Sequence, residues 1–315
     1  MKRKYSYLRA LLFMPLFLAI LFFGGGNQKA FGKDIPENIL WLLPSSTLHH
    51  PFDTLGGNMI LPLSQPIVIA HRGDSKHAPE NTLPAFKRAL RFNPEMIELD
   101  YHGKDFVVIH DETFDRTTDA VKKWGHSDNR VTSHTLAQIK TLDAGIKKGP
   151  EFEKTRVPTL KESMDVIQRS SFTLIERKEG EPKDLFHFLK KEGWETDVVV
   201  QSFDWDFIRD IREYSNAISC GALGPPWGEY KGQILTEEEK WLNEEFIDDI
   251  ASRGARFVAW NNWVTTKSIA LAHKKDLRVL IYTIDDPDEA ERLVKLGVDG
   301  IITNDPETIA KRLRS

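Results

Sequence analysis

The sequence predicts an α/β protein in which eight parallel strands, separated by helices, close into a (β/α)8 barrel, the TIM-barrel fold. Short runs of apolar and β-branched residues alternate with longer charged stretches of helical spacing, a pattern that indicates strand–helix–strand units and a parallel sheet. Eight such runs within about 250 residues suit a closed barrel better than an open sheet. The first run is not followed by Gly-x-Gly-x-x-Gly, so an open dinucleotide-binding sheet has no support.

The barrel is expected to occupy residues 63–315. The predicted strands are 67–70, 96–100, 173–176, 198–202, 218–222, 257–260, 279–283 and 300–303. Amphipathic helices are expected between several of them, at 83–91, 184–191, 204–214 and 287–296.

One further apolar run interrupts this alternation. Residues 107–110 follow the second strand too closely for a helical crossover, so we expect them to return beside it as a hairpin. His110 would then lie near the mouth that Glu98 and Asp100 reach. Residues 112–157 contain no clean strand, and we interpret them as a small insertion, after the His110-Asp111 motif, that helps to shape the substrate site.

The N-terminal segment differs in kind from the barrel. Four basic residues within the first nine precede an uncharged, mostly apolar stretch at 10–26, which is the pattern of an export signal. The stretch is a little short for a membrane span, and Gln28-Lys29-Ala30, which follows it, is not a small-x-small cleavage triplet. We therefore expect residues 1–32 to be either a signal peptide or an N-terminal membrane anchor, with residues 33–62 as an extension. In both cases the barrel would be exported.

Composition excludes some classes of function. The chain has 43 Lys+Arg against 47 Asp+Glu and a formal net charge of -4, which gives no electrostatic case for binding nucleic acid. A hydrophobic fraction of 40% is ordinary for a chain with a buried core. Cys220 is the single cysteine, so no intramolecular disulfide can form, and its apolar neighbours predict a core position.

Three carboxylates are candidates for a metal site. Glu98 and Asp100 are two residues apart on one predicted strand, so their side chains point to the same side. Glu176 ends another strand and would meet them at the same mouth. Crowded carboxylates repel one another unless a cation or strong donors hold them, and such oxygen ligands suit Ca²⁺ or Mg²⁺. The alternative is that these acids cap loops or pair with lysines at strand ends.

Two histidines stand at the ends of apolar runs. His71 and His110 could act as general acid and base on opposite sides of one scissile bond. Taken singly, each could equally be a partly buried histidine that bonds to the backbone.

Two basic residues lie close in sequence to these candidate residues. Arg72 follows His71, and Gly73 permits a turn that would let Arg72 clamp a phosphate; its alternative is a surface salt bridge. Lys178 is two residues from Glu176, should share its face, and would add a point charge.

Weaker candidates lie nearby. Asn81 or Thr82 is expected to cap the helix that follows, and Glu80 could add a ligand. Trp260 and Tyr282 stand at strand ends, where they could flank a small polar substrate.

Together these motifs resemble the glycerophosphodiester phosphodiesterase family, over the chain from about residue 67 to its end. The resemblance is carried, in the family's order, by His71-Arg72-Gly73, Pro79-Glu80-Asn81-Thr82, Glu98-Leu99-Asp100, His110-Asp111 with Arg116-Thr117-Thr118, Pro158-Thr159-Leu160, Glu176-x-Lys178, Gln201-Ser202-Phe203 and Gly297 to Thr303. Three features depart from the family pattern. The segment between Glu98 and His110 is about two residues shorter, with His102-Gly-Lys-Asp105 in place of a Thr-Lys-Asp-Gly turn. Arg177 replaces an aliphatic residue, and Tyr282-Thr283 replaces Trp-Thr.

The resemblance implies a TIM-type barrel and a specific chemistry. It implies one divalent cation, usually Ca²⁺ or Mg²⁺, held by Glu98, Asp100 and Glu176. His71 and His110 would form the acid/base pair, and Arg72 and Lys178 would bind the phosphate. The implied reaction is hydrolysis of a small-molecule glycerophosphodiester to sn-glycerol 3-phosphate and an alcohol. The alternatives are a lipid substrate, such as a lysophospholipid or sphingomyelin, and a catalytically silent barrel that binds phosphorylated ligands.

Overall fold

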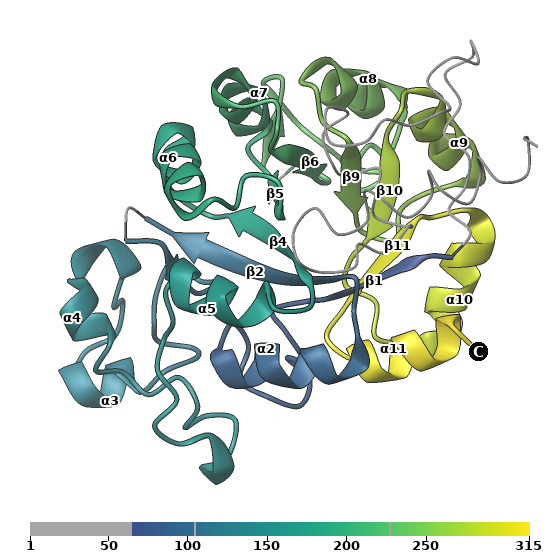
Figure 1. Cartoon of the computed structure of the whole chain (residues 1–315). Coiled ribbons are helices and arrows are strands. Elements are labelled where there is room, and N and C mark those ends of the chain that lie inside the picture. The colour runs from purple at the N-terminus through teal and green to yellow at the C-terminus, as the bar shows by residue number, and fades with distance from the viewer. Residues whose placement is uncertain (1–64, 104, 227) are drawn as a thin grey trace, which may run out of the picture. The chain divides into compact units, whose positions relative to one another are not determined.

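A computed structural model describes residues 65–103, 105–226 and 228–315, and within these ranges eight parallel strands form a closed barrel (Figure 1). The strands are β1 (Ile67–Ala70), β2 (Met96–His102), β4 (Phe172–Arg177), β5 (Val198–Ser202), β6 (Ser219–Leu223), β9 (Phe257–Trp260), β10 (Arg278–Ile281) and β11 (Gly300–Thr303). Neighbours follow the order β1–β11–β10–β9–β6–β5–β4–β2, and the β1–β2 pairing closes the ring. The predicted fold is confirmed.

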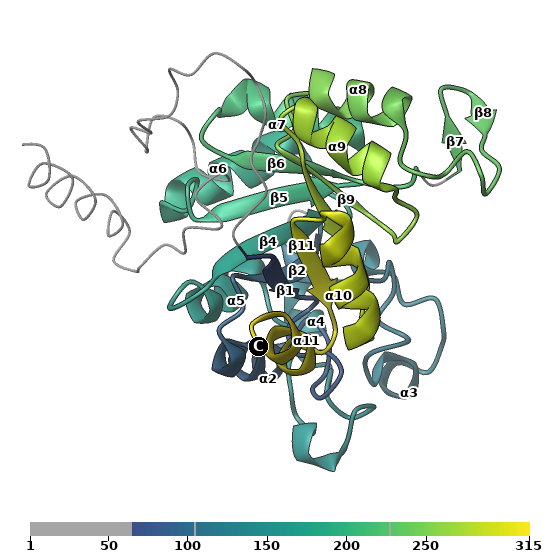
Figure 2. The same ribbon diagram turned by 90° about the vertical axis from the view of Figure 1, so that its right-hand side faces the viewer.

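Helices surround the barrel and connect successive strands (Figure 2). They are α2 (Leu83–Ala89), α5 (Leu160–Ile167), α6 (Pro182–Glu192), α7 (Trp205–Tyr214), α8 (Glu244–Ser252), α9 (Thr266–Lys274), α10 (Pro287–Leu296) and α11 (Pro306–Leu313). Several begin where the sequence supplies a cap: the side chains of Asp204, Asp286 and Asp305 accept N–H groups of the first turn. In the described part of the chain, none of the helices has the length and apolarity needed to cross a bilayer.

Alternation along each strand separates two layers of buried side chains. On β2, Ile97, Leu99 and Tyr101 belong to the large apolar cluster that includes helix residues such as Phe86 and Leu160. The intervening residues of the strand therefore face the barrel interior. This period of two directs acidic side chains inward from a strand that is buried along its whole length.

The hairpin and the insertion follow β2. β3 (Val107–Val108) pairs antiparallel with β2, with Tyr101 opposite Val108, as predicted. The insertion then forms α3 (Ala120–Trp124), α4 (Leu136–Ile139) and the 3-10 turns η3 (Val131–Ser133) and η4 (Pro150–Phe152). It has its own small apolar core, which includes Phe114 and Leu142.

Two smaller features complete the described elements. The 3-10 turn η2 (Leu90–Phe92) extends α2, and a short hairpin of β7 (Glu229–Tyr230) and β8 (Gln233–Ile234) lies between β6 and α8. The predicted signal peptide or anchor at 1–32 and the extension at 33–62 lie outside the described residues.

Candidate active site

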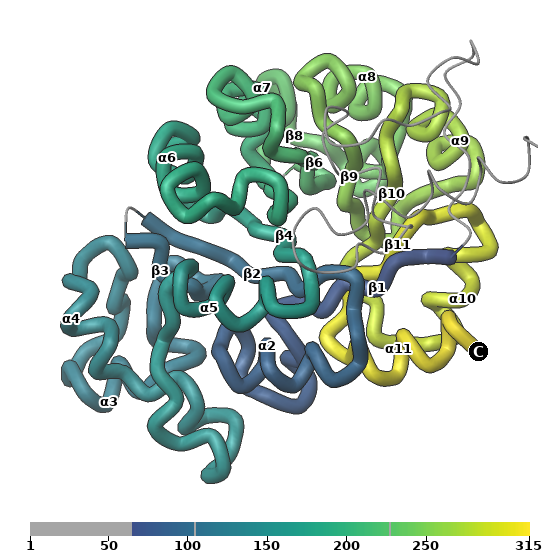
Figure 3. Tube along the Cα trace, in the orientation of Figure 1, coloured from purple at the N-terminus to yellow at the C-terminus, as the bar shows by residue number. Residues whose placement is uncertain are grey.

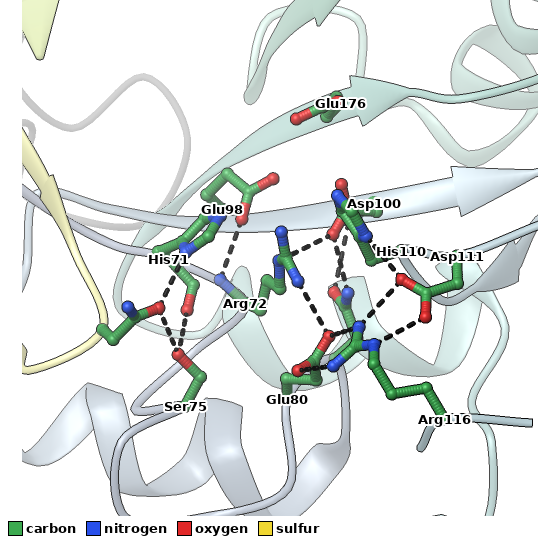
Figure 4. Close-up of polar contacts among 12 residues, drawn as sticks. His71, Arg72, Ser75, Glu80, Glu98, Asp100, His110, Asp111, Arg116 and Glu176 are labelled. Atoms are coloured by element: carbon green, nitrogen blue, oxygen red, sulfur yellow. Dashed lines mark hydrogen bonds and ion pairs between the residues drawn. The ribbon is translucent and has the colours of Figure 1, made fainter. Parts of the chain in front are cut away.

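Three buried acids meet at the carboxyl end of the barrel. Glu98 and Asp100 are 0% exposed and Glu176 is 6% exposed, and each offers one carboxylate oxygen that lies within 4.8 Å of the others. The register of the sheet brings them together, because Asp100 on β2 is paired with Glu176 on β4. The predicted convergence of these three residues is confirmed, and Figure 4 shows them around one space.

The cluster is incompletely satisfied. Glu98 Oε1 is buried and has no hydrogen-bond partner among the described residues, although buried carboxylate oxygens normally have donors. Burial, followed by repulsion from Asp100, raises the pKa of Glu98 well above its usual range. The same two causes raise the pKa of Glu176 to about 7. A set of oxygen donors with a free lone pair and mutual repulsion is chemically suited to a hard divalent cation.

Two basic side chains lie against the same acids. Arg72 Nε is 3.3 Å from Asp100 Oδ2, and Lys178 Nζ is 3.2 Å from Asp100 Oδ1. Lys178 also pairs with Glu176. Burial alone would raise the pKa of Asp100, but the charges of Lys178 and then Arg72 outweigh it and lower the pKa.

The backbone turn at the end of β1 places Arg72. Both Arg72 and Gly73 have positive φ, 55° and 84°, and a Cβ on Gly73 would lie 2.7 Å from the Ala85 carbonyl carbon. The predicted turn is therefore present and requires glycine at its second residue. It aims the Arg72 backbone N–H at Glu98 Oε2, 2.8 Å away, and the guanidinium at Glu80 Oε1, also 2.8 Å away.

His71 is held by residues at the opposite end of the chain. Its Nδ1 lies 2.8 Å from Asn304 Oδ1, just beyond β11. Asn304 is oriented in turn by Asp285, whose Oδ2 accepts from Asn304 Nδ2 at 2.8 Å. The Ser75 hydroxyl donates to both Asn304 Oδ1 and the His71 carbonyl. Desolvation, and then the charge of Arg72, lowers the pKa of His71 to about 4.

His110 lies on the other side of Arg72 in the view of Figure 4. Its Nδ1 is 2.7 Å from Asp111 Oδ1. Arg116 donates to both Asp111 and Glu80, so the insertion is tied to the turn after β1. Burial opposes ionisation of Asp111, but the hydrogen bonds from His110 and Arg116 outweigh it and lower its pKa.

Some sequence-based interpretations need correction. Thr82 occupies the N-cap position of α2, but neither it nor Asn81 caps the helix through a side chain. Asn81 instead donates to Asp100 Oδ2 at 2.7 Å and accepts from the Asp100 N–H. Glu80 pairs with Arg72 and Arg116 and is not one of the clustered acids.

Trp260 does not line the mouth, which corrects a second interpretation. It is 0% exposed and belongs to the apolar layer under the helices, because its place on β9 faces outward. Tyr282 is half-buried at the mouth, where its hydroxyl donates to Gly224 O at 2.6 Å. Arg177 does point toward the helices, where it pairs with Asp204 and lies over the Phe207 ring.

Sequence reasoning missed the residues that hold His71. Asn304, Asp285 and Ser75 were not selected, although Asn304 directly follows the last predicted strand. The strand-end rule that selected His71 would also have found Asn304.

A parallel barrel whose carboxyl end gathers acids, two imidazoles and two cations is the architecture of a hydrolase that acts on a charged substrate. The sequence of residues 71–308 matches the family model of the glycerophosphoryl diester phosphodiesterase family. The chain belongs to this family, and its predicted membership in an enzyme family of phosphodiesterases is confirmed.

Two relatives and one solved structure are similar to this chain over most of its length. A glycerophosphodiester phosphodiesterase of Caldanaerobacter subterraneus subsp. tengcongensis is 36% identical over 264 residues, which cover 79% of this chain and 98% of the relative. A glycerophosphodiester phosphodiesterase of Bacillus subtilis is 27% identical over 278 residues, covering 81% and 88%. An Oleispira antarctica phosphodiesterase, solved with the product sn-glycerol-3-phosphate, shares the fold with a TM-score of 0.68 at 24% identity, covering 80% of this chain and 98% of that chain.

Proposed function

We propose that this protein hydrolyses glycerophosphodiesters to sn-glycerol 3-phosphate and an alcohol, with a divalent cation at the acid cluster. The observation that carries the proposal is the unsatisfied Glu98 Oε1 among three converging carboxylates. The imidazoles of His71 and His110 flank this cluster (Figure 4). The names of the relatives support the choice of substrate.

Glu98, Asp100 and Glu176 would hold the cation, Ca²⁺ or Mg²⁺, since both prefer carboxylate oxygens. When bound, the cation supplies positive charge that stabilises the phosphoryl oxygens in the transition state. Arg72 and Lys178 already contact Asp100, so their charges are placed to bind the phosphate beside it.

The hydrogen bonds of His71 favour the role of general base. Asn304 gives its NH₂ to Asp285, so its carbonyl oxygen faces His71 and accepts from Nδ1–H. Nε2 is then the nitrogen with a free lone pair. Because the pKa of His71 is lowered to about 4, the imidazole is neutral at pH 7 and can take a proton from the nucleophile. That nucleophile is either a water or the substrate's own glycerol hydroxyl. In the second case the leaving alcohol departs from a cyclic glycerol phosphate, which a water must then open to give sn-glycerol 3-phosphate.

The partner of His110 favours the role of general acid. A carboxylate accepts hydrogen bonds only, so Asp111 Oδ1 fixes the proton of His110 on Nδ1. The negative charge of Asp111 also stabilises an imidazolium. Its Nε2–H would then be donated to the leaving alkoxide.

Turnover of glycerophosphocholine by His71→Ala and His110→Ala tests these roles. Each variant should lose about 10²- to 10⁴-fold in kcat/KM, the usual contribution of general acid–base catalysis, with an unchanged melting temperature. His187→Ala, which changes an exposed histidine on α6, is the matched control. EDTA should abolish the wild-type activity, and added Ca²⁺ or Mg²⁺ should restore it. Near-normal turnover by either active-site variant, or in EDTA, would refute the corresponding part of the proposal.

We also propose that the barrel is exported, on the basis of the charged and apolar N-terminal segment. Fusing residues 1–62 to alkaline phosphatase, which is active only after export, tests this. A fusion that stays inactive while a known export signal activates the reporter would exclude it.

A further inference from the structure

The structure assigns Gln201 as a substrate-binding residue that accepts a hydrogen bond from a hydroxyl of the glycerol moiety. This inference rests on the proposed function and names the part of the substrate that lies beside the acid cluster. It begins from an unsatisfied atom: Gln201 is 2% exposed, and its side-chain oxygen has no hydrogen-bond partner among the described residues.

The direction of the Gln201 side chain follows from its strand. Val198 and Val200 on β5 belong to the apolar layer under the helices. Side chains alternate along a strand, so Gln201 faces the barrel interior. Its position in the sheet is opposite Glu176, which is in turn opposite Asp100. Three neighbouring strands therefore present Asp100, Glu176 and Gln201 at one level of the mouth.

The protein offers no donor to the Gln201 oxygen from the neighbouring strand. The residue paired with Gln201 on β6 is Gly221, which has no side chain. A Cβ at Gly221 would lie 2.2 Å from Phe257 Cζ, so an apolar ring fills that space. On the other side Glu176 Oε1 is engaged by Lys178. A buried amide oxygen in these surroundings is costly until a ligand provides a donor.

The position suits a substrate hydroxyl better than the cation. Gln201 is two strands away from Asp100, roughly 10 Å between backbones at the usual strand spacing. The acid cluster lies on β2 and β4, so Gln201 stands at its edge. A phosphate bound at the cluster would place its attached polyol within reach of such an edge. An amide oxygen is an acceptor, and a glycerol hydroxyl is the donor that it lacks.

Competitive inhibition of the full-length protein with Ca²⁺ tests this assignment. The two inhibitors are sn-glycerol 3-phosphate and 1-propyl phosphate, which share the phosphate and the three carbons but differ in the hydroxyls. Wild type should favour sn-glycerol 3-phosphate by about tenfold or more, since a buried acceptor left unpaired disfavours the analogue. Gln201→Met should reduce the ratio to about threefold or less and leave the Ki of 1-propyl phosphate unchanged.

Two further variants keep the test decisive. Gln201→Glu retains an acceptor oxygen, so the ratio between the inhibitors should persist even if added charge weakens both. Ser219→Ala removes another buried oxygen without a hydrogen-bond partner among the described residues, at the start of β6, and should change neither Ki. If Gln201→Met is unstable, Gln201→Leu, which also removes the acceptor oxygen, should show the same reduced ratio, with Ser219→Ala as control.

Three results in Gln201→Met would overturn the assignment: no change in either Ki, an equal rise of both Ki values, or a tenfold weaker affinity for Ca²⁺ in calorimetry. The last two would place Gln201 on the phosphate or the cation. If the wild type fails to hydrolyse glycerophosphocholine, the proposed function fails instead, and calorimetric binding of the same two phosphates then tests Gln201 alone.

Discussion

The two ends of the barrel both bury charged side chains, but they satisfy them differently. At the amino end, Asp299 Oδ1 accepts from Arg278 Nη1 at 2.8 Å, and Oδ2 accepts from the Val279 N–H at 2.8 Å. His273 Nε2 lies 2.7 Å from the same Oδ2. Each carboxylate oxygen of Asp299 therefore has a partner within the protein.

At the carboxyl end, burial leaves charges in conflict. Glu98 retains an unpartnered oxygen among the described residues, and repulsion within the cluster contributes to the raised pKa values of Glu98 and Glu176. We infer that the buried charged side chains stabilise the fold at the amino end and contribute to function at the carboxyl end. Variants at each end should therefore change different measured quantities.

The largest expected effect is the loss of activity caused by Glu98→Gln at the carboxyl end of the barrel. If Glu98 is a ligand of the proposed cation, this variant should lower kcat/KM for glycerophosphocholine by about 10³-fold, since a bound metal ion contributes several kcal/mol of transition-state stabilisation. In EDTA the variant should melt at the same temperature as wild type or higher, because an uncharged amide avoids the burial cost and the repulsion that raise the pKa of Glu98. Loss of activity together with a lower melting temperature in EDTA would contradict this interpretation of the cluster.

Asp299→Ala, at the amino end of the barrel, should lower stability and leave substrate binding unchanged. It leaves Arg278 without its carboxylate, so the free energy of unfolding should fall by about 3–5 kcal/mol in urea titrations. At 15 °C the remaining folded protein should keep the wild-type KM. A changed KM with unchanged stability would show that the two ends are not separate in function.

A smaller effect is expected in the pH dependence of the unfolding free energy, which should differ between wild type and a variant of His71 at the carboxyl end. Because the pKa of His71 is lowered to about 4 from 6.5, its neutral form stabilises the fold fully above pH 6.5, and this contribution is lost as the pH falls toward 4. Between pH 6.5 and 4.5, wild type should lose more unfolding free energy than His71→Gln, by the order of 1 kcal/mol given the partial exposure of the ring. Parallel stability curves for the two proteins would contradict this.

The sequence was sufficient for the strands and for the residues with strong local signals. Four of the eight predicted strands agree with the structure, such as Ile67–Ala70. The other four differ by one or two residues at one or both ends, such as 173–176 within Phe172–Arg177. The spacing of Glu98 and Asp100 also predicted their shared face, because alternation along a strand is a local rule.

The partners of the site residues could not be predicted in the same way. Asn304 is 233 positions from His71, and only closure of the barrel brings them together. Trp260 shows the second limit: it ends a strand, as site residues do, but the parity of its position turns it outward. Asn81 has the composition of a helix cap, yet Asp100 competes for its side chain, a tertiary contact that no local pattern reveals.

The pairing of β1 with β11 has a consequence for the order of assembly. The ring closes only when the last strand arrives beside the first, as the tube in Figure 3 shows. Because Asn304 follows that last strand, His71 acquires its hydrogen-bond partner at the same moment. During synthesis the ribosome must therefore release nearly the whole chain before His71 can be oriented, so an unfinished polypeptide carries this histidine but not its alignment.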